Sequence, residues 1–152
     1  MPEDRMPYDE WTMADIVTMW GKTHHVIMSA LQDSIGHERL ERELRGPMQQ
    51  AGREAARPRP ADAVAIGRAI MAIERPWGIE GRVIKATPNH FVREVTRCPW
   101  SYFCPLGCEV FAWWMEGFVA GSNEHLRYAL EKLVPRRDPV CIWKVQTAEP
   151  GP

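Results

Sequence analysis

The sequence lacks an excess of charge of either sign. Its 152 residues include 19 lysines and arginines and 20 aspartates and glutamates, which gives a formal net charge of −1 at pH 7. Acidic and basic residues are interspersed, whereas proteins that bind nucleic acid usually present a strongly basic face. The charge pattern therefore argues against a nucleic-acid partner.

The sequence also has no long hydrophobic run. A membrane-spanning helix needs about 20 predominantly apolar residues, and the most hydrophobic stretch here is broken by Glu109 and Glu116. We therefore expect no membrane partner. The polar start, MPEDRMPYDEW, is unlike a secretory signal peptide, so we expect a cytoplasmic protein whose thiols stay reduced. Its four cysteines would form two disulfides only in an exported protein.

Familiar catalytic motifs are missing as well. The chain contains no glycine-rich phosphate loop, no Gly-x-Ser-x-Gly nucleophile elbow and no His-Glu-x-x-His zinc motif. It has no internal repeat either. Any chemistry must therefore be inferred from individual residues and their spacing.

What the sequence does contain fits a single domain with two parts. Hydrophobic residues make up 45% and charged residues 26% of the chain, which are ordinary values for a globular protein. A chain of this length can bury a core without disulfide or metal staples. We expect one domain over 1–152, with a helical part over 10–75, a sheet with a central helix over 79–147, and a disordered tail over 148–152.

Helical periodicity marks the first part. Apolar residues at helical spacing predict a helix from Glu10 to about Ser34, which Gly36 ends. A charged helical piece follows from Glu38 to Arg45, and we expect Gly46-Pro47 to interrupt it. Residues 52–60 are predicted to be a linker or a fraying helix end.

A third helix, opened by Pro60 and running to Ile73, leads into the second part. Pro105 then opens a helix that is apolar nearly all round and reaches about Val119, which predicts that it is buried. Four strands are expected, at 81–86, 91–98, 125–134 and 140–145. Residues 126–133 also fit helical periodicity. The predicted fold is α+β: an N-terminal helical layer followed by a ββαββ unit with an antiparallel sheet.

Three of the four cysteines are concentrated between Arg97 and Asn123, beside the aromatic helix. Cys104 and Cys108 are four residues apart and share one face at the helix N-terminus. Partial positive charge at that end stabilises a thiolate and lowers a cysteine pKa, so Cys108 is the best candidate nucleophile and Cys104 the second. Free cysteines are also among the most buried residue types, and packing remains the competing interpretation.

Glu116 is the candidate acid or base for such a nucleophile. It lies deep in the aromatic helix, and a carboxylate in an apolar pocket has a raised pKa that suits proton transfer near neutral pH. Glu109, in the first turn, is expected instead to be exposed and to interact with the helix dipole. His125 and His90 are candidate bases for a thiol.

Candidate substrate-binding residues surround these groups. Arg97 would hold a substrate carboxylate in a bidentate contact, although Arg93 and Arg97 are explained more simply as solvent-facing charges. Glu94 alternates onto the opposite face of the strand, and either face would line a pocket. Tryptophans are more typical of a core than of a ligand cage; Trp113 is included as a candidate pocket wall.

No metal or other cofactor is predicted. The cysteines are spaced Cys-x5-Cys-x3-Cys, with Cys141 distant, whereas structural zinc sites use paired Cys-x2–4-Cys knuckles and iron–sulfur motifs have other spacings. A four-thiolate site would require the last strand to pass the start of the aromatic helix.

Short strings in the second part carry a family resemblance. They are Arg-Cys-Pro-Trp at 97–100, Cys108 opening a helix, Gly-Ser-Asn at 121–123 and Asp-Pro-Val-Cys at 138–141. With them, residues 80–146 resemble the L-2-amino-thiazoline-4-carboxylic acid hydrolase family, and also vinyl-reductase-type small-molecule-binding domains.

The resemblance implies a bacterial cytoplasmic enzyme that opens or hydrolyses a small heterocycle. Cys108 and Asn123 are the positions it carries over, and Cys98 and Cys141 are further matches. The chain departs from the family pattern at Phe111, where a carboxylate is expected, and at 138–139, where Asp-Pro replaces Gly-Asp. These departures are compatible with a divergent activity in specialised metabolism.

The leading hypothesis is a hydrolase of carbon–nitrogen or carbon–sulfur bonds in a small ring. Cys108 would attack as a thiolate, Glu116 or a histidine would move protons, Asn123 and Arg97 would position the substrate, and N–H groups at the helix start would stabilise the oxyanion. The alternative is a non-catalytic sensor or carrier with an aromatic pocket, in which the cysteines are packing. A zinc-thiolate domain is a third hypothesis. Exposed apolar residues on the N-terminal helices would also support a homodimer.

Overall fold

The structure, a computed structural model, describes residues 12–57 and 61–148. Its first helix, α1, spans Met13–Ile35 and ends at Gly36, whose φ of 82° lies in the region that favours glycine. Thr12 and Asp15 form a reciprocal capping box at its start. The predicted helix and its glycine stop are confirmed, while the predicted start at residues 10–11 lies outside the described residues.

The second helix, α2, spans His37–Ala55 without interruption, so the prediction that Gly46-Pro47 breaks it is wrong. Of the two predictions for residues 52–60, the linker is wrong for 52–55, which form the end of the same helix as the alternative of a helix end has it; residues 58–60 lie outside the description. An interior proline costs a helix one hydrogen bond and crowds the preceding turn. Here α2 packs along the length of α4 (Pro105–Ser122), and this burial outweighs the local cost.

The third helix and the first hairpin follow the predictions closely. Helix α3 spans Ala63–Glu74 and is capped by Asp62, whose side chain accepts a hydrogen bond from the backbone N–H of Ala65. After a 3-10 turn, η1 (Arg75–Trp77), strands β1 (Glu80–Thr87) and β2 (His90–Arg97) pair in antiparallel fashion.

The second hairpin follows α4. Strand β3 spans Leu126–Lys132, a short 3-10 turn η2 covers Val134–Arg136, and strand β4 spans Cys141–Thr147. The helical alternative for 126–133 is therefore wrong, because this segment pairs along β4. Residues 149–152, most of the predicted tail, lie outside the described residues, and Ala148 donates a backbone hydrogen bond to His125.

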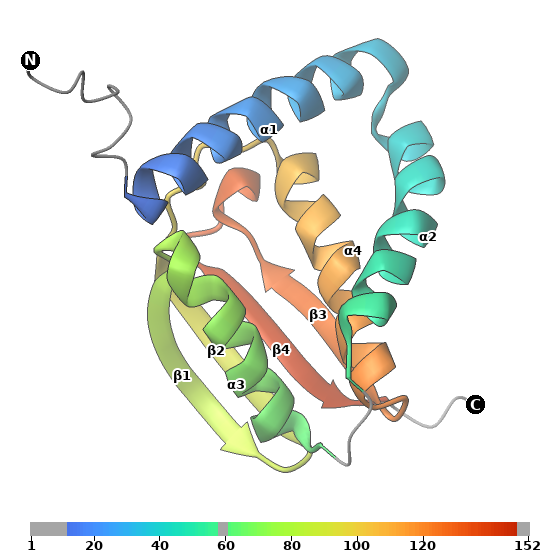
Figure 1. Cartoon of the computed structure of the whole chain (residues 1–152), viewed down its shortest axis with the longest axis vertical. Helices are drawn as coiled ribbons and strands as arrows, with labels where there is room; N and C mark the ends of the chain where they lie inside the picture. The colour runs from blue at the N-terminus through green and yellow to red at the C-terminus, as the bar shows by residue number, and fades with distance from the viewer. Residues whose placement is uncertain (1–11, 58–60, 149–152) are drawn as a thin grey trace, which may run out of the picture.

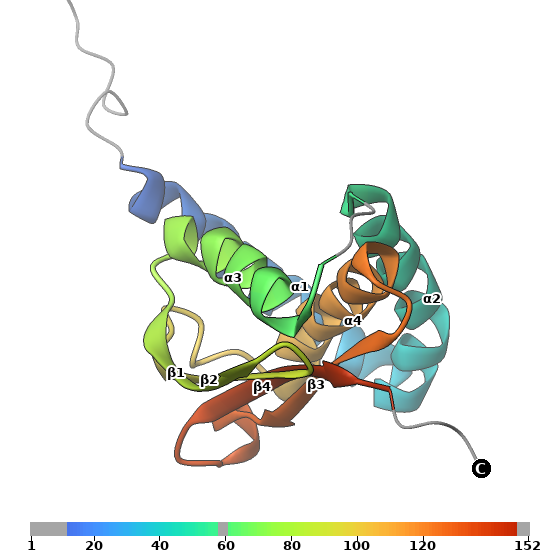
Figure 2. The ribbon, with the colours of Figure 1, turned by 90° about the horizontal axis from the view of Figure 1, so that it is seen from below.

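The four strands form one antiparallel sheet in the order β1-β2-β4-β3. Helices α3 and α4 lie over one face of this sheet (Figure 2). Helix α2 runs along the outer side of α4, and α1 crosses one end of the molecule (Figure 1). The predicted α+β fold, with N-terminal helices followed by a ββαββ unit, is confirmed. Within the described residues no helix is long and apolar enough to cross a membrane.

Two hydrophobic cores meet at α4, which explains why this helix is apolar nearly all round. The larger core joins α3, α4 and the sheet through residues such as Ile70, Phe91 and Val119. The smaller core joins α1, α2 and α4 through Met28, Leu40, Leu106, Val110 and Trp113. One side of α4 therefore faces the sheet and the other faces the N-terminal helices.

Two glycines bring the backbones of α2 and α4 together. A Cβ atom added to Gly117 would lie 1.9 Å from the carbonyl oxygen of Gln49, and one added to Gly52 would lie 2.0 Å from the carbonyl oxygen of Trp114. No side chain fits at either position. The spacing of α2 and α4, and with it the position of every polar group between them, depends on these two residues.

Candidate functional site

Two Pro-Trp dipeptides meet at the open end of the β1–β2 hairpin. Glu80 pairs with Arg97 at this end of the hairpin, and Trp77 of η1 and Trp100 lie in the segments just outside the two strands. Their ring centroids lie 5.1 Å apart, and both rings contact Phe111 of α4, at 5.7 and 5.2 Å. These three rings, here called the aromatic wall, separate two hollows in the protein.

The hollow on the inner side of the wall contains three thiols. Cys98 follows β2, Cys108 lies in the first turns of α4, and Cys141 begins β4, and all three line a cavity of about 100 Å³, here called the thiol cavity. The rest of its lining is formed by Glu74, Trp77, Ile79, Val95, Trp100, Phe111, Ala112, Met115, Tyr128, Leu130 and Leu133. The sequence clusters Cys98, Cys104 and Cys108 and leaves open whether the cysteines meet in space; the structure brings Cys141 to Cys98 and Cys108 and leaves Cys104 outside the cavity.

The hollow on the outer side opens beside α1. It has a volume of about 330 Å³ and is lined by Val17, Trp20, Gly21 and His24 of α1 together with the three rings of the aromatic wall. We call it the aromatic cleft. Gly21 is required here, because an added Cβ would lie 2.2 Å from the indole nitrogen of Trp100.

The thiols of the cavity are protonated at neutral pH. Burial raises the pKa of Cys108 strongly, and the neighbouring thiols Cys98 and Cys141 raise it further. Burial likewise raises the pKa of Cys98 and of Cys141. The expectation of a lowered pKa for Cys108 is wrong, because the helix dipole acts mainly within the first turn while desolvation of the thiolate dominates at this depth.

A buried ion pair forms one side of the thiol cavity. Glu74, 6% exposed, accepts hydrogen bonds from Nε of Arg93 at 2.8 Å and from the indole N–H of Trp143 at 2.7 Å. Burial nevertheless raises the pKa of Glu74 above its usual value, outweighing the nearby guanidinium and the two hydrogen bonds. The prediction that Arg93 faces solvent is wrong: it is 4% exposed and faces α3.

Two polar groups meet at the aromatic cleft. The indole N–H of Trp100 is buried and has no hydrogen-bond partner within the described residues. The Nε2 atom of His24 lies 3.0 Å from the carbonyl oxygen of Gly107. Because a carbonyl only accepts, this nitrogen carries the proton, and in the neutral ring Nδ1 is then an acceptor. The indole N–H of Trp100 is therefore packed against Gly21 at the wall of the cleft, and the ring of His24 lies among the aromatic surfaces.

Cys104 and Trp113 lie outside both hollows. Cys104 is the N-cap residue of α4, its backbone N–H donates to Nδ1 of His25 at 3.4 Å, and its side chain packs on the smaller core. Trp113 belongs to that smaller core, on the side of α4 that faces α1 and α2. Neither residue lines the thiol cavity.

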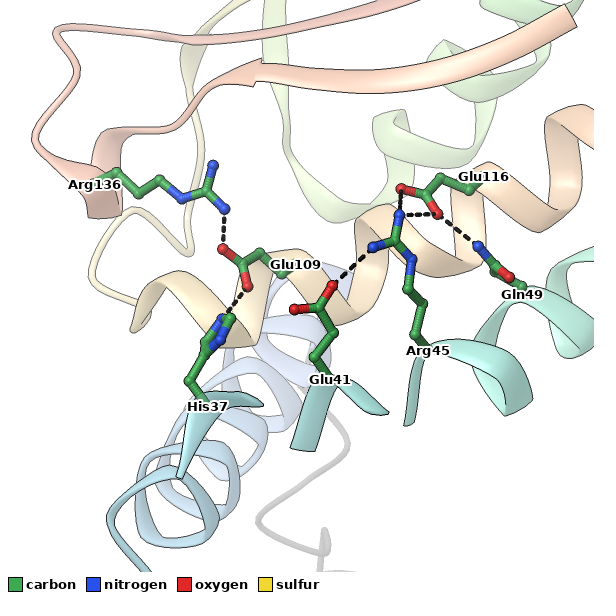
Figure 3. A network of polar contacts seen from close by, with 7 residues as sticks. All are labelled: His37, Glu41, Arg45, Gln49, Glu109, Glu116 and Arg136. Atoms are coloured by element: carbon green, nitrogen blue, oxygen red, sulfur yellow. Dashed lines mark hydrogen bonds and ion pairs between the residues drawn. The ribbon is translucent and has the colours of Figure 1, made fainter. Parts of the chain in front are cut away.

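Glu116 and Glu109 face α2 and the η2 turn rather than the sheet, as Figure 3 shows. Glu116 accepts hydrogen bonds from Arg45 at 3.1 Å and from Gln49 at 2.7 Å. Glu109, expected to be exposed, is only 8% exposed and is bound by His37 and Arg136. Burial would raise the pKa of Glu109, but these two partners hold it below its usual value.

Asn123 and His125 lie at the far end of α4. The side chain of Asn123 donates to the carbonyl of Ala61 and accepts from the backbone N–H of His125, both at 2.9 Å, so it ties the end of α4 to the start of α3. His125 is 83% exposed. The 14 residues from Cys108 to Ser122 correspond to about 20 Å of helix, so His125 does not reach the thiols.

Glu94 and Arg97 lie on strand β2 and bind other exposed residues. Glu94 pairs with Arg82 at 2.8 Å, and Arg97, 74% exposed, lies 3.3 Å from Glu80. Of the ten predicted site residues, the structure brings together Cys98, Cys108 and Cys141. The described residues hold no group of three or more His, Cys, Asp or Glu side chains arranged to bind a metal ion.

The sequence interpretation missed the aromatic wall, although a signal for it was present. Pro76-Trp77 precedes and Pro99-Trp100 follows the predicted hairpin, each within a few residues of a strand end. Antiparallel pairing brings these two flanking segments to the same end of the hairpin, which favours contact between their tryptophans. Glu74 and Tyr128, which also line the thiol cavity, carried no comparable signal.

Comparisons with known proteins add no family to this description. No protein-family model matches the chain, and no curated protein matches it. The functional argument therefore depends on the site itself.

Proposed function

We propose that the protein binds a small, flat, largely apolar molecule in the aromatic cleft. The cleft volume of about 330 Å³ falls at the lower end of the roughly 300–1,000 Å³ typical of small-molecule pockets. Four aromatic side chains, Trp20, Trp77, Trp100 and Phe111, line it together with His24. A planar ring would stack on these surfaces.

The buried indole N–H of Trp100 carries this proposal. A buried donor without a partner is unfavourable by about 1–3 kcal/mol, and such groups are rare in folded proteins. The Trp100 nitrogen lies at the cleft wall beside Gly21. A ligand oxygen or ring nitrogen that accepts this hydrogen bond would remove the penalty, so the ligand class is an aromatic molecule with one hydrogen-bond acceptor.

The protonation of the thiols supports binding over covalent catalysis. Cysteine attacks as a thiolate, and burial raises the pKa of Cys108, Cys98 and Cys141. Neutral thiols are small, polarisable, nearly apolar groups that suit packing behind the aromatic wall, on the side away from the cleft. All four cysteines are free, which supports a reducing compartment, the cytoplasm.

A matched pair of probes tests the proposal. Indane and 1-indanone have the same bicyclic frame, and only 1-indanone has an acceptor oxygen. We expect quenching of tryptophan fluorescence by both, with 1-indanone binding about 3–10-fold more tightly, as one neutral hydrogen bond provides. The preference should vanish in Trp100→Phe. Absence of binding by both probes at millimolar concentration would sink the proposal.

A cysteine-dependent hydrolase is the second candidate, because Cys108 and the carboxyl group of Glu74 line one cavity. In this version Glu74 would take the proton of Cys108, in place of Glu116 and His125, and the thiolate would attack the electrophilic ring carbon. The ring C–N or C–S bond would then break as Glu74 returns the proton to the leaving nitrogen or sulfur, and water would release the product and restore Cys108. Thiol labelling of the native protein, read for each cysteine by mass spectrometry across pH, separates the candidates. Rapid labelling of Cys108 well below the ~8.5 of a free thiol would favour the hydrolase, whereas inertness until unfolding supports binding. Turnover of 2-amino-thiazoline-4-carboxylate that survives Cys108→Ala would exclude the covalent step.

A further inference from the structure

The outer side of α1 is an apolar surface that no described element covers. Of the ten large hydrophobic side chains that are strongly exposed within the described residues, seven belong to this helix. They are Met13, Met19, Trp20, Val26, Ile27, Leu31 and Ile35. In Figure 1 the helix crosses one end of the molecule, with the sheet, α4 and α2 on one side of it.

The spacing of these residues fits packing against another helix. Met13, Trp20 and Ile27 follow each other at intervals of seven, the repeat by which one helix keeps a seam toward a partner. Trp20 is 63% and Ile27 52% exposed. Seven side chains of this size present several hundred Å², a large part of the roughly 800 Å² that each partner contributes to a standard interface.

A second copy of the same chain fits this surface in one orientation. Apart from its histidines, α1 carries only three charged residues, Asp15, Lys22 and Asp33. Parallel pairing in register would place each of them opposite itself. Antiparallel pairing about a point between Thr23 and His24, where the numbers of opposed residues add to 47, places none of them level with its own copy. Asp15 is level with Gln32, Lys22 with His25 and Asp33 with Ala14, and all three lie about 200° around the helix from Met13, Trp20 and Leu31, which precede them by two positions.

A membrane surface fits less well. Interfacial helices carry several lysines or arginines beside their apolar face, whereas α1 has a single lysine and two aspartates. The low and balanced charge is typical of a surface that meets its own copy, since a two-fold interface must be self-complementary.

We propose that two copies pair antiparallel through α1, and that the partner subunit's Ile27 closes the aromatic cleft over Trp20. The pairing brings Trp20 opposite the partner subunit's Ile27, and Trp20 both lines the cleft and belongs to the exposed surface. The closing step rests on the proposed function, while the pairing itself does not. Each dimer then contains two clefts, each completed by a residue of the other subunit.

Sedimentation of the ligand-free protein tests the pairing. We expect a dimer at micromolar concentration that Ile27→Glu converts to monomer. Ile84→Glu is the matched control, because Ile84 of β1 is also 52% exposed, and it should remain dimeric. A wild-type monomer at 100 micromolar, or dissociation by Ile84→Glu alone, would overturn the proposal. Circular dichroism verifies that both variants fold.

Cross-linking tests the orientation. In the proposed pairing two copies of residue 23 are offset by one residue along the helix, about 1.5 Å, so Thr23→Cys should form a disulfide-linked dimer on mild oxidation. Copies of residue 34 are offset by 21 residues, roughly 32 Å, so Ser34→Cys should behave like the wild type. A dimer linked through Ser34→Cys and not through Thr23→Cys would exclude the antiparallel arrangement.

Ligand affinity then separates the closing step from the binding proposal. If the partner subunit's Ile27 closes the cleft, Ile27→Glu should weaken 1-indanone binding by about fivefold or more, while Ile84→Glu leaves it unchanged. Unchanged affinity in a monomeric Ile27→Glu variant would overturn the closing step alone. Failure of 1-indanone to bind the dimeric wild type would count against the proposed function and leave the pairing intact.

Discussion

Cys108 and Glu109 are adjacent residues of α4, yet their pKa values move in opposite directions. Cys108 faces the sheet and finds other thiols there, so burial raises its pKa. Glu109 faces α2 and the η2 turn, where bonds from His37 and Arg136 outweigh its burial and lower its pKa. The helix and its dipole are common to both residues. The difference shows that the surroundings on each side of α4 decide the direction in which each pKa moves.

Glu74 lies between these two extremes. It is buried like Cys108 and has charged and polar partners like Glu109, namely Arg93 and Trp143. Its pKa is nevertheless raised, because desolvation is the largest effect on it. Two partners therefore outweigh burial at Glu109, whose partners His37 and Arg136 are themselves partly exposed, and fall short at Glu74, whose partner Arg93 is itself buried.

Removing the partner of the most deeply buried carboxylate should have the largest effect. Arg93→Met leaves Glu74 without its counter-ion, and breaking a buried ion pair destabilises a protein by about 3–5 kcal/mol. Urea unfolding at pH 7 measures this loss. Arg97→Met, four residues along the same strand, removes a pair whose side chains are 74% and 63% exposed and should change stability by less than about 1 kcal/mol. Equal effects of the two variants would contradict the assignment.

The loss of stability caused by Arg93→Met should also depend on pH. The pKa of Glu74 is raised in the folded protein, and loss of Arg93 raises it further. A carboxyl group with a higher pKa in the folded state binds its proton more tightly there, so stability falls as the pH rises through the folded pKa. The destabilisation by Arg93→Met should therefore shrink as the pH is lowered from 7 toward 5, and a constant difference would refute this explanation.

A side chain that pushes α2 away from α4 should disrupt the contacts between these two helices. Gly117→Ala introduces a Cβ at 1.9 Å from the carbonyl of Gln49, and such overpacking typically costs about 1–3 kcal/mol. Gly46→Ala in α2 meets no atom within 4 Å and should stabilise the helix by up to about 1 kcal/mol. Thermal unfolding compares the two variants. A neutral Gly117→Ala would mean that the helices do not approach as closely as described.

Local patterns in the sequence were sufficient for most of the fold. Gly36, Asp62 and Pro105 mark helix ends through their own backbone chemistry, and alternation marked both hairpins. The continuation of α2 through Pro47 could not be predicted in this way, because it depends on packing against a helix about 60 residues later. Helix propensity describes the local free-energy cost of a proline inside α2, whereas burial against α4 decides whether the helix continues.

The candidate site was predictable only where its residues are close in sequence or paired by a hairpin. The grouping of cysteines near residues 98–108 is visible in the chain, and the meeting of Trp77 with Trp100 is favoured by the hairpin. Ionisation was not predictable, because it depends on distant partners. Glu109 binds His37, 72 residues away, and no spacing rule indicates that contact.

The smallest effect is expected at Glu109, the carboxylate of the opening comparison, because both of its partners are partly exposed. Glu109→Gln weakens the contacts with His37 and Arg136, whose side chains are 43% and 46% exposed, so we expect a loss of only about 1 kcal/mol at pH 7. The pKa of Glu109 is lowered in the folded state, so its contribution is present above its unfolded pKa and is lost as the pH falls through the folded value. Urea unfolding between pH 7 and pH 3 should show the wild type and Glu109→Gln converging in acid. Glu43→Gln, an exposed carboxylate on α2, should follow the wild type throughout, and a gap that widens in acid would show that Glu109 is not held ionised by its two partners.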